Sequence, residues 1–472
     1  MFQYLTFFYA SVVCAQTHDF RAFGVPAHEI HAVILDEKSG ALIEKHQENK
    51  PALPASVMKI VTSVAALELL QKNHSWSTDF WYDAQAGALT IVGNGDPKIT
   101  WEDLQAIFFR LRELGVRDLP GGIILDATAV TPVPDTAFDG QDLKPYNVAP
   151  HGLLFNFKSL GFKFRASAES GNRVSIEPRP WPKQVAVVNQ LRLTSGPCGD
   201  WKERLNAQFL NHKQSAQVVF RGTYAAACGE REWFVSLLDH EHYNQGFVEW
   251  VWRQSDMGNL GPVRTGTLPV NGGQLKKVAT HQSPPLSRML ADVNQFSNNV
   301  MARLVLMRLA QLAPRAQQAQ RQAVLPLSEA LGAEVLRHWW QTRAFGQAGF
   351  EVENGSGLSR RERLTALGLA NVLLHASKGD YAEDFRRSLV KIDFGDGLDN
   401  KRYGKNMSAQ HAGVSAFVKT GTLNDVRSLA GYVRRGDAPG LVFVIMVNSE
   451  KAHAAEQVVD AYLRHVVQRL GR

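Results

Sequence analysis

The two ends of this 472-residue chain carry one kind of pattern, and the stretch between them carries another. Near the start, residues 31–35 and 41–43 are apolar runs that flank the turn residues 36–40, which is typical of a β-hairpin. Near the end, three apolar runs predict strands and an amphipathic stretch predicts a helix, at residues 416–423, 428–433, 441–447 and 454–470. Sheet pieces at both termini indicate that the two ends form one α/β domain.

Between residues 79 and 277 the pattern changes to short strand-like stretches separated by glycine and proline turns. Residues 162–231 are especially rich in such stretches, whereas residues 278–378 return to helical periodicity. A chain of this length is expected to form two or three domains. We therefore predict an outer domain (24–78 and 278–472), an inserted domain II (79–161 and 232–277) and a nested β-rich domain III (162–231).

The first residues of the chain, 1–15, are apolar and resemble a secretory signal that is cleaved after Ala15. No Lys or Arg precedes the apolar stretch, so the usual basic start is missing. The alternatives are a native N-terminal strand and a lipid anchor on Cys14, which Val13 disfavours because a small residue is wanted there. We expect export, with the mature protein in the periplasm of the cell envelope.

Two cysteines remain if Cys14 leaves with the signal. Cys198 and Cys228 are then an even pair in an exported protein, which predicts a disulfide. The alternative is two unrelated buried thiols.

The net charge of +7 is spread along the chain. Neither a basic helix nor an aromatic RNA-binding signature accompanies it, so no nucleic-acid partner is expected. A mildly basic surface suits an anionic wall polymer or peripheral contact with a membrane surface, and charge alone does not choose between them.

Three short motifs occur in one order along the chain. Ser56 opens the apolar stretch 56–70, which predicts a buried central helix after Pro51 and Pro54. The second motif lies where a loop is expected to enter a helix, and the third lies on a predicted strand. The motifs are Ser56-Val57-Met58-Lys59, Ser297-Asn298-Asn299 and Lys419-Thr420-Gly421.

Lys59 is expected to activate Ser56. Residues three apart share a helix face, so Lys59 lies one turn from Ser56. Burial of a lysine on an apolar helix lowers its pKa, which favours the neutral amine. A neutral amine beside a hydroxyl is the arrangement that a serine nucleophile needs. The alternative is a lysine that extends to solvent.

The second motif supplies candidate partners for this pair. We expect Ser297 to relay a proton between Lys59 and the leaving group, and Asn299 to hold Lys59 or a substrate amide by hydrogen bonds. The alternative is that Ser297-Asn298-Asn299 only caps a helix.

The third motif suits recognition of a carboxylate. Lys419 and Thr420 on a strand edge can bind a terminal carboxylate, and Gly421 lets a ligand approach the backbone closely. The expected oxyanion hole consists of the N–H groups of Ser56 and Thr422. The alternative is an ordinary strand end.

These motifs and their flanking strings carry a specific resemblance. From about residue 24 to the C-terminus the chain resembles the low-molecular-mass class C penicillin-binding proteins, the D-alanyl-D-alanine carboxypeptidase/endopeptidases. Two departures, Asn94 for a usual glycine and Leu398 for a usual threonine, lie outside the three motifs. The flanking strings are PAS at 54–56, GNGDP at 93–97, SNNVMA at 297–302, NGSGLSR at 354–360 and KTGTL at 419–423.

The resemblance implies an α/β (α+β) fold. Its catalytic domain would be transpeptidase-like and serine β-lactamase-like, with an antiparallel sheet and helices, interrupted by nested β-rich inserted domains. The implied activity is cleavage of peptidoglycan stem peptides through a Ser56 acyl-enzyme. β-Lactam antibiotics would bind covalently, and no cofactor would be required.

Two other functions compete with this one. A serine β-lactamase shares the acylation chemistry. Class A enzymes, however, are much shorter chains, whereas here about 240 residues separate Ser56 from Ser297. A non-catalytic wall-binding or β-lactam-sensing protein would not need every reactive group.

The cluster Asp239-His240-Glu241-His242 is adjacent in sequence and lacks a distant third ligand, so we expect a surface loop and no metal.

Overall fold

The computed structural model describes residues 24–167, 173–210, 212–269, 275–313, 325–346, 349–394 and 413–470. The expected signal segment 1–15 and Leu398 lie outside the described residues. Among the described helices, none is long and apolar enough to cross a membrane. The described residues divide into two compact units: unit 1 comprises those within Met1–Val64, Trp339–Val352 and Arg360–Arg472, and unit 2 those within Ala65–His338 and Glu353–Ser359.

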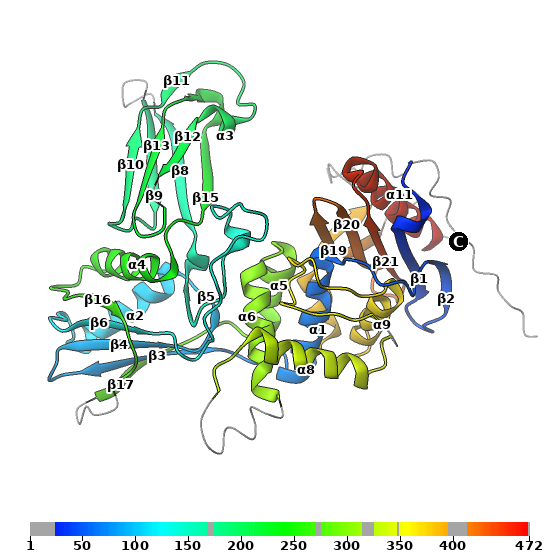
Figure 1. Cartoon of the computed structure of the whole chain (residues 1–472), viewed down its shortest axis with the longest axis horizontal. Helices are drawn as coiled ribbons and strands as arrows, with labels where there is room; N and C mark the ends of the chain where they lie inside the picture. The colour runs from blue at the N-terminus through cyan, green and yellow to red at the C-terminus, as the bar shows by residue number, and fades with distance from the viewer. Residues whose placement is uncertain are drawn as a thin grey trace, which may run out of the picture. The chain divides into compact units, whose positions relative to one another are not determined.

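Unit 1 is built on a six-stranded antiparallel sheet in which strands from both ends of the chain are neighbours. Strand β21 pairs with β1 from Val447 opposite Ile30 to Leu441 opposite Asp36. The predicted union of the two termini in one sheet is confirmed (Figure 1). The strand order is β18 (Val390–Phe394), β19 (Val414–Leu423), β20 (Val426–Arg435), β21 (Leu441–Asn448), β1 (Ile30–Asp36) and β2 (Leu42–His46).

Helices cover both faces of this sheet. Successive residues of a strand point to opposite sides, so one strand can contact helices on both faces. Leu429 and Val433 of β20 pack in one core with Val458 of α11 (Ala452–Leu470). Tyr432 points the other way, and its hydroxyl donates a hydrogen bond to the Leu373 carbonyl of α9 at 2.7 Å. The other helices that begin or end in this unit are α1 (Met58–Leu70), α8 (Glu329–Thr342), α9 (Ala366–Ala376) and α10 (Ala382–Ser388).

Unit 2 contains a five-stranded mixed sheet with two helices packed together. Helices α2 (Trp101–Glu113) and α4 (His240–Gln254) meet through Phe108 and Trp252, whose ring centroids are 5.1 Å apart. The strand order is β16 (Val263–Thr265), β6 (Gly122–Asp126), β4 (Ala88–Gly93), β3 (Ser77–Asp83) and β17 (Leu275–Gln282).

The stretch predicted as the nested β-rich domain forms three small sheets. Aromatic side chains fill the space beneath them, with Phe164 edge-on to Phe220 at 5.2 Å between ring centroids. Cys198 and Cys228 are disulfide-bonded in the structure. The strands are β8 (Leu160–Ser167), β9 (Arg173–Arg179) and β15 (Glu230–Val235) in one sheet, β10 (Val185–Asn189), β12 (Ala207–Leu210) and β13 (Ala216–Phe220) in another, and β11 (Arg192–Thr194) with β14 (Thr223–Ala225).

Helices α5 (Leu286–Gln295) and α6 (Asn299–Leu309) also belong to unit 2, where β5 (Asp96–Ile99) pairs with β7 (Leu153–Phe155). Val300 and Leu304 of α6 share a core with Val130, which explains why they group with this unit. The sequence assigned residues 278–338 to the outer domain. The two-way division does not test the three predicted domains, whose boundaries stay a prediction.

Candidate active site

The backbone before Ser56 is fastened on two sides. Ala52 forms a two-hydrogen-bond bridge with Leu364, at 2.9 and 3.2 Å. Leu53 is clamped by the side-chain amide of Asn448 at the end of β21, which accepts from its N–H at 2.8 Å and donates to its carbonyl at 3.0 Å. Ala55 then adopts a left-handed conformation with φ of 49°. Such a conformation persists only where the surroundings fix it, and here it sets the position of Ser56.

Ser56 lies in a short 3-10 turn, Ala55–Val57, that leads directly into α1. The Lys59 Nζ lies 3.0 Å from the Ser56 Oγ, within hydrogen-bond distance. Ser56 keeps partial exposure, whereas Lys59 is fully buried. The predicted buried helix is confirmed as α1, and Lys59 is buried along with its apolar residues.

The surroundings of Lys59 favour its neutral form. Burial lowers its pKa well below the usual lysine value, and the nearby positive charge of Lys419 lowers it further. The charge of Glu362 acts in the opposite direction, with a smaller effect. A neutral amine can accept the hydroxyl proton of Ser56, which is the role the sequence predicts for it.

The third motif lies on β19, on the strand segment that approaches Ser56. A Cβ atom on Gly421 would lie 2.8 Å from the Pro54 carbonyl oxygen and 3.1 Å from the Ser56 nitrogen, so only glycine fits without displacement. Lys419 is buried, and its Nζ donates a hydrogen bond to the Thr420 carbonyl at 2.8 Å. Burial lowers the pKa of Lys419 to about 7.

The second motif lies in unit 2, at the start of α6. Ser297 has a left-handed backbone with φ of 54°, and Asn298 caps the helix by accepting a hydrogen bond from Met301 N at 3.1 Å. The capping alternative therefore holds for Asn298. Asn299 is buried, and its side-chain amide donates to the Tyr146 carbonyl at 3.0 Å.

The structure thus brings Ser56, Lys59 and the Lys419-Thr420-Gly421 motif together within unit 1. Ser297 and Asn299 lie in the other unit, and their expected contacts with Lys59 stay a prediction. The oxyanion hole of Ser56 and Thr422 also stays a prediction.

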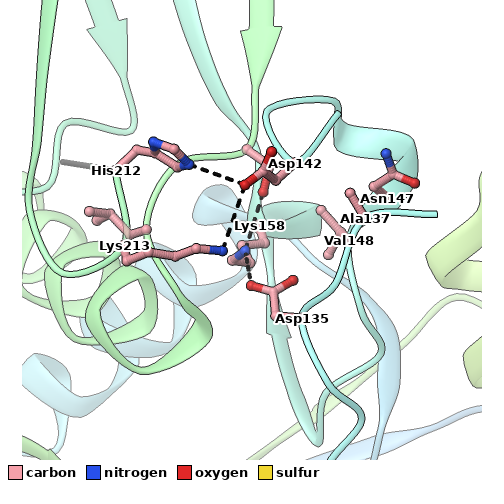
Figure 2. A pocket seen from close by; sticks show the side chains of 10 residues that line it. Asp135, Ala137, Asp142, Asn147, Val148, Lys158, His212 and Lys213 are labelled. Atoms are coloured by element: carbon pink, nitrogen blue, oxygen red, sulfur yellow. Dashed lines mark hydrogen bonds and ion pairs between the residues drawn. The ribbon is translucent and has the colours of Figure 1, made fainter. Parts of the chain in front are cut away.

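The loop that carries Tyr146 is fastened by polar contacts to the turns at the ends of the nested strands (Figure 2). Buried Lys158 donates hydrogen bonds to Asp135 at 2.8 Å and to the Ser236 hydroxyl at 3.3 Å. Asp142, on the same loop, lies 3.3 Å from the His212 ring nitrogen and 3.9 Å from the Lys213 Nζ. These contacts hold in place the segment whose carbonyl binds Asn299.

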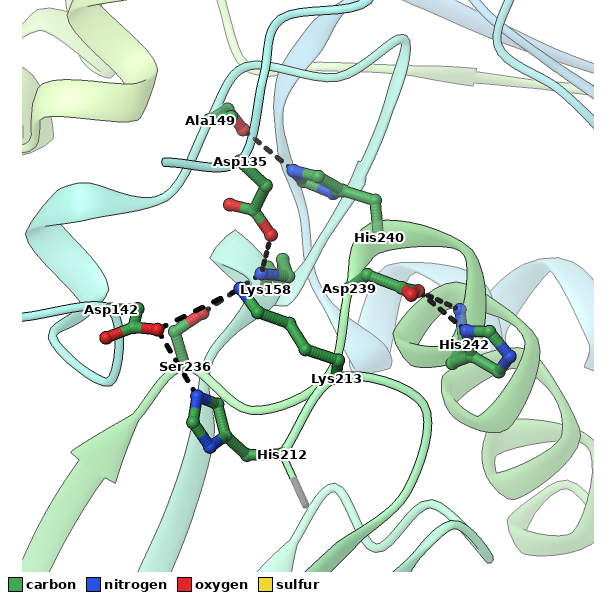
Figure 3. A network of polar contacts seen from close by, with 10 residues as sticks. All are labelled: Asp135, Asp142, Ala149, Lys158, His212, Lys213, Ser236, Asp239, His240 and His242. Atoms are coloured by element: carbon green, nitrogen blue, oxygen red, sulfur yellow. Dashed lines mark hydrogen bonds and ion pairs between the residues drawn. The ribbon is translucent and has the colours of Figure 1, made fainter. Parts of the chain in front are cut away.

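The Asp239-His240-Glu241-His242 cluster has ordinary structural roles at the start of α4 (Figure 3). Asp239 is the helix cap and accepts from the His242 backbone N–H at 2.9 Å and from its ring at 2.8 Å. His240 points away from them, with its Nε2 3.0 Å from the Ala149 carbonyl oxygen. The expectation of a surface loop is wrong for His240, which lies in the first turn of α4. Burial lowers its pKa well below the usual histidine value.

Two residues near Ser56 were not predicted from the sequence. Glu362 is fully buried and acts electrostatically on Lys59, although its neighbours Arg361 and Arg363 suggest a solvent-facing charged run. Asn448 clamps Leu53 from the far end of the chain. Neither has a local sequence signal, because each acts through a contact between distant segments.

Similarity to known proteins covers most of the chain. The D-Ala-D-Ala carboxypeptidase 3 (S13) family matches residues 24–466. A D-alanyl-D-alanine carboxypeptidase of Actinomadura sp. (strain R39) is 25% identical over 452 residues, which are 91% of this chain and 79% of that protein.

Two solved structures share the fold. Penicillin binding protein 4 of Haemophilus influenzae superposes with a TM-score of 0.69 at 19% identity, covering 95% of this chain and 99% of that one. A predatory endopeptidase of Bdellovibrio bacteriovorus gives 0.53 at 12% identity and covers 93% of each chain. These two structures show the fold alone, whereas the family match over residues 24–466 shows that the chain belongs to the D-Ala-D-Ala carboxypeptidase 3 (S13) family.

Proposed function

We propose that the protein is a serine-type D-alanyl-D-alanine carboxypeptidase and endopeptidase that acts on peptidoglycan stem peptides through an ester on Ser56. The observation that carries this proposal is the 3.0 Å contact between the Ser56 Oγ and the Nζ of fully buried Lys59. Family membership and the resemblance of the flanking strings support the same chemistry.

The reaction begins with transfer of the Ser56 hydroxyl proton to the Lys59 Nζ. The Ser56 Oγ attacks the carbonyl carbon of the penultimate D-alanine, and the N–H groups of Ser56 and Thr422 hold the oxyanion. The peptide C–N bond breaks, and the departing amine takes the proton, with Ser297 as the relay. Water then attacks the ester and restores the Ser56 hydroxyl.

The terminal carboxylate of the substrate is held by Lys419 and Thr420. Burial lowers the pKa of Lys419 to about 7, and a bound carboxylate beside its Nζ would favour the charged ammonium form. Asn299 would orient the substrate amide or Lys59. This arrangement needs no cofactor.

β-Lactams are proposed as covalent inhibitors of the same serine. The Haemophilus influenzae relative has also been crystallised as a complex with a β-lactam. Attack by Ser56 on the lactam carbonyl would form an ester and open the ring. The proposed location is the periplasm, which the apolar residues 1–15 suggest.

Two substrates test the proposal. The purified protein should release D-alanine from a soluble pentapeptide that ends in D-Ala-D-Ala, and should split a cross-linked muropeptide. Ser56→Ala should abolish both activities, whereas Ser415→Ala on β19 should retain them. A folded wild-type protein that cleaves neither substrate would contradict the proposal, and rapid turnover of penicillin would indicate a β-lactamase instead.

A further inference from the structure

One face of the sheet formed by β15, β8 and β9 in unit 2 points away from the core. Phe162 and Phe164 of β8 are fully buried, so the alternating residues Gly161, Lys163 and Arg165 lie on the opposite face. The register places Lys163 between Glu232 and Glu177. It places Gly161 between Phe234 and Arg179.

A cavity of about 310 Å³ opens on this face. Trp101 and Glu102, from the first turn of α2, form one part of its wall. The sheet supplies most of the remainder, chiefly Lys163, Arg179, Glu232 and Phe234. A volume of this size lies at the lower end of the range for small-molecule sites.

An aromatic ring forms part of the cavity wall. A Cβ atom on Gly161 would lie only 2.8 Å from the Phe234 Cε1, so the ring rests directly over this glycine. Phe234 nevertheless keeps 52% of its surface exposed, which leaves ring surface open to a ligand. Trp101 is fixed beside the cavity by an edge-to-face contact with Trp250 at 5.9 Å.

The charges on this wall balance, and part of them is free to bind a ligand. Arg179 pairs with Glu177 at 2.7 Å and lies over the Trp101 ring at 5.8 Å. Within the described part of the chain, Glu102 and Glu232 form no ion pair, and both are exposed. They are therefore available as hydrogen-bond acceptors, next to guanidinium and ammonium donors.

This combination selects the chemistry of the ligand. A phosphate group or a nucleic acid requires excess positive charge, which a wall of balanced charges does not offer. A sugar is neutral, carries hydroxyl groups that both donate and accept hydrogen bonds, and presents an apolar ring face to an aromatic side chain. Carboxylates, cationic donors and the exposed ring of Phe234 in one cavity match each of these groups.

We propose that this cavity binds a glycan strand of N-acetylated amino sugars. The inference rests on the proposed function, because stem peptides are attached to such a strand in peptidoglycan. Binding of the strand would raise the effective concentration of the enzyme near peptides of the same polymer. Free stem peptides would gain nothing from the site.

Direct binding of the N-acetylglucosamine tetramer to the full chain tests the site, with calorimetry as the measurement. Phe234→Ala should weaken binding about tenfold through loss of ring stacking. Glu232→Gln, which keeps the side-chain shape, should also weaken it. Phe109→Ala is the matched control, since Phe109 is an exposed ring of the same unit (37% exposed) outside the cavity wall, and it should bind as wild type does.

Activity on two substrates separates this inference from the proposed function. Phe234→Ala should cleave the soluble pentapeptide and bind penicillin at wild-type rates, yet act more slowly on intact wall sacculi. Failure of the wild type to bind the tetramer, or binding that both variants leave unchanged, would overturn the glycan site. Failure to cleave the pentapeptide, with tetramer binding intact, would overturn the proposed function alone.

Discussion

Substitution of Gly421 by alanine should slow acylation of Ser56 with little effect on the remainder of the sheet. The added Cβ would lie 2.8 Å from the Pro54 carbonyl oxygen, which is 0.6 Å inside the ordinary contact limit of 3.4 Å. The opposing atoms are backbone, and the segment is fixed by the Ala52 and Leu53 hydrogen bonds. The strain must therefore be relieved by movement of β19 or of the turn that carries Ser56.

The size of the effect follows from what that turn supplies. Loss of a single oxyanion-hole donor typically slows a reaction about 10²- to 10³-fold. A misplacement of about 1 Å can cost about 10²-fold. Because the expected shift is below 1 Å, we predict that the acylation rate falls by up to about 10²-fold.

Stopped-flow measurement with a fluorescent penicillin gives this rate directly. Gly346→Ala is the control, because the nearest atom to its added Cβ lies 3.6 Å away, and it should acylate at the wild-type rate. Thermal unfolding checks that both variants are folded. Wild-type acylation by folded Gly421→Ala would refute the argument that this close approach sets the position of Ser56.

Three further predictions concern recognition and stability. Lys419→Ala should lower kcat/KM on a D-Ala-D-Ala peptide about 10- to 150-fold and barely affect an amidated peptide, and equal losses on both would exclude a carboxylate contact. Burial raises the pKa of Asp96 to about 7, so its contribution to the free energy of unfolding is present below about pH 4 and is lost as the pH rises to 7. Asp96→Asn should remove that loss, at most about 4 kcal/mol, and equal pH dependence in urea unfolding of both proteins would contradict it. Replacing Cys198 and Cys228 by serine should cost about 3–4 kcal/mol of unfolding free energy, and no change in the urea midpoint would argue against the bond.

The elements of unit 1 could be predicted closely from local patterns. Strand β1 was expected at 31–35 and covers Ile30–Asp36, and the final helix was expected at 454–470 and covers Ala452–Leu470. Within residues 278–378, whose periodicity predicts helices, α9 begins at Ala366 because the Thr365 hydroxyl caps it by accepting from Gly368 N at 3.0 Å. Strong periodicity determines such elements, and a cap shifts only their ends.

Long-range contacts could not be predicted in the same way. The helix expected from Ser56 begins as a 3-10 turn, since Ala55 is held in a left-handed conformation by a segment clamped to Asn448. The burial of Glu362 beside Lys59 likewise depends on tertiary packing. The reactive residues were found because their spacing on a helix and a strand is local, whereas the groups that position them come from distant parts of the chain.

The central claim is that Ser56 is the nucleophile, and intact-mass analysis after incubation with penicillin tests it most directly. The wild type should gain the mass of one penicillin, peptide mapping should place the adduct on Ser56, and Ser56→Ala should gain none. Lys59→Ala should acylate far more slowly, because it removes the proposed base. An adduct that persists in Ser56→Ala, or that maps to another residue, would contradict the assignment.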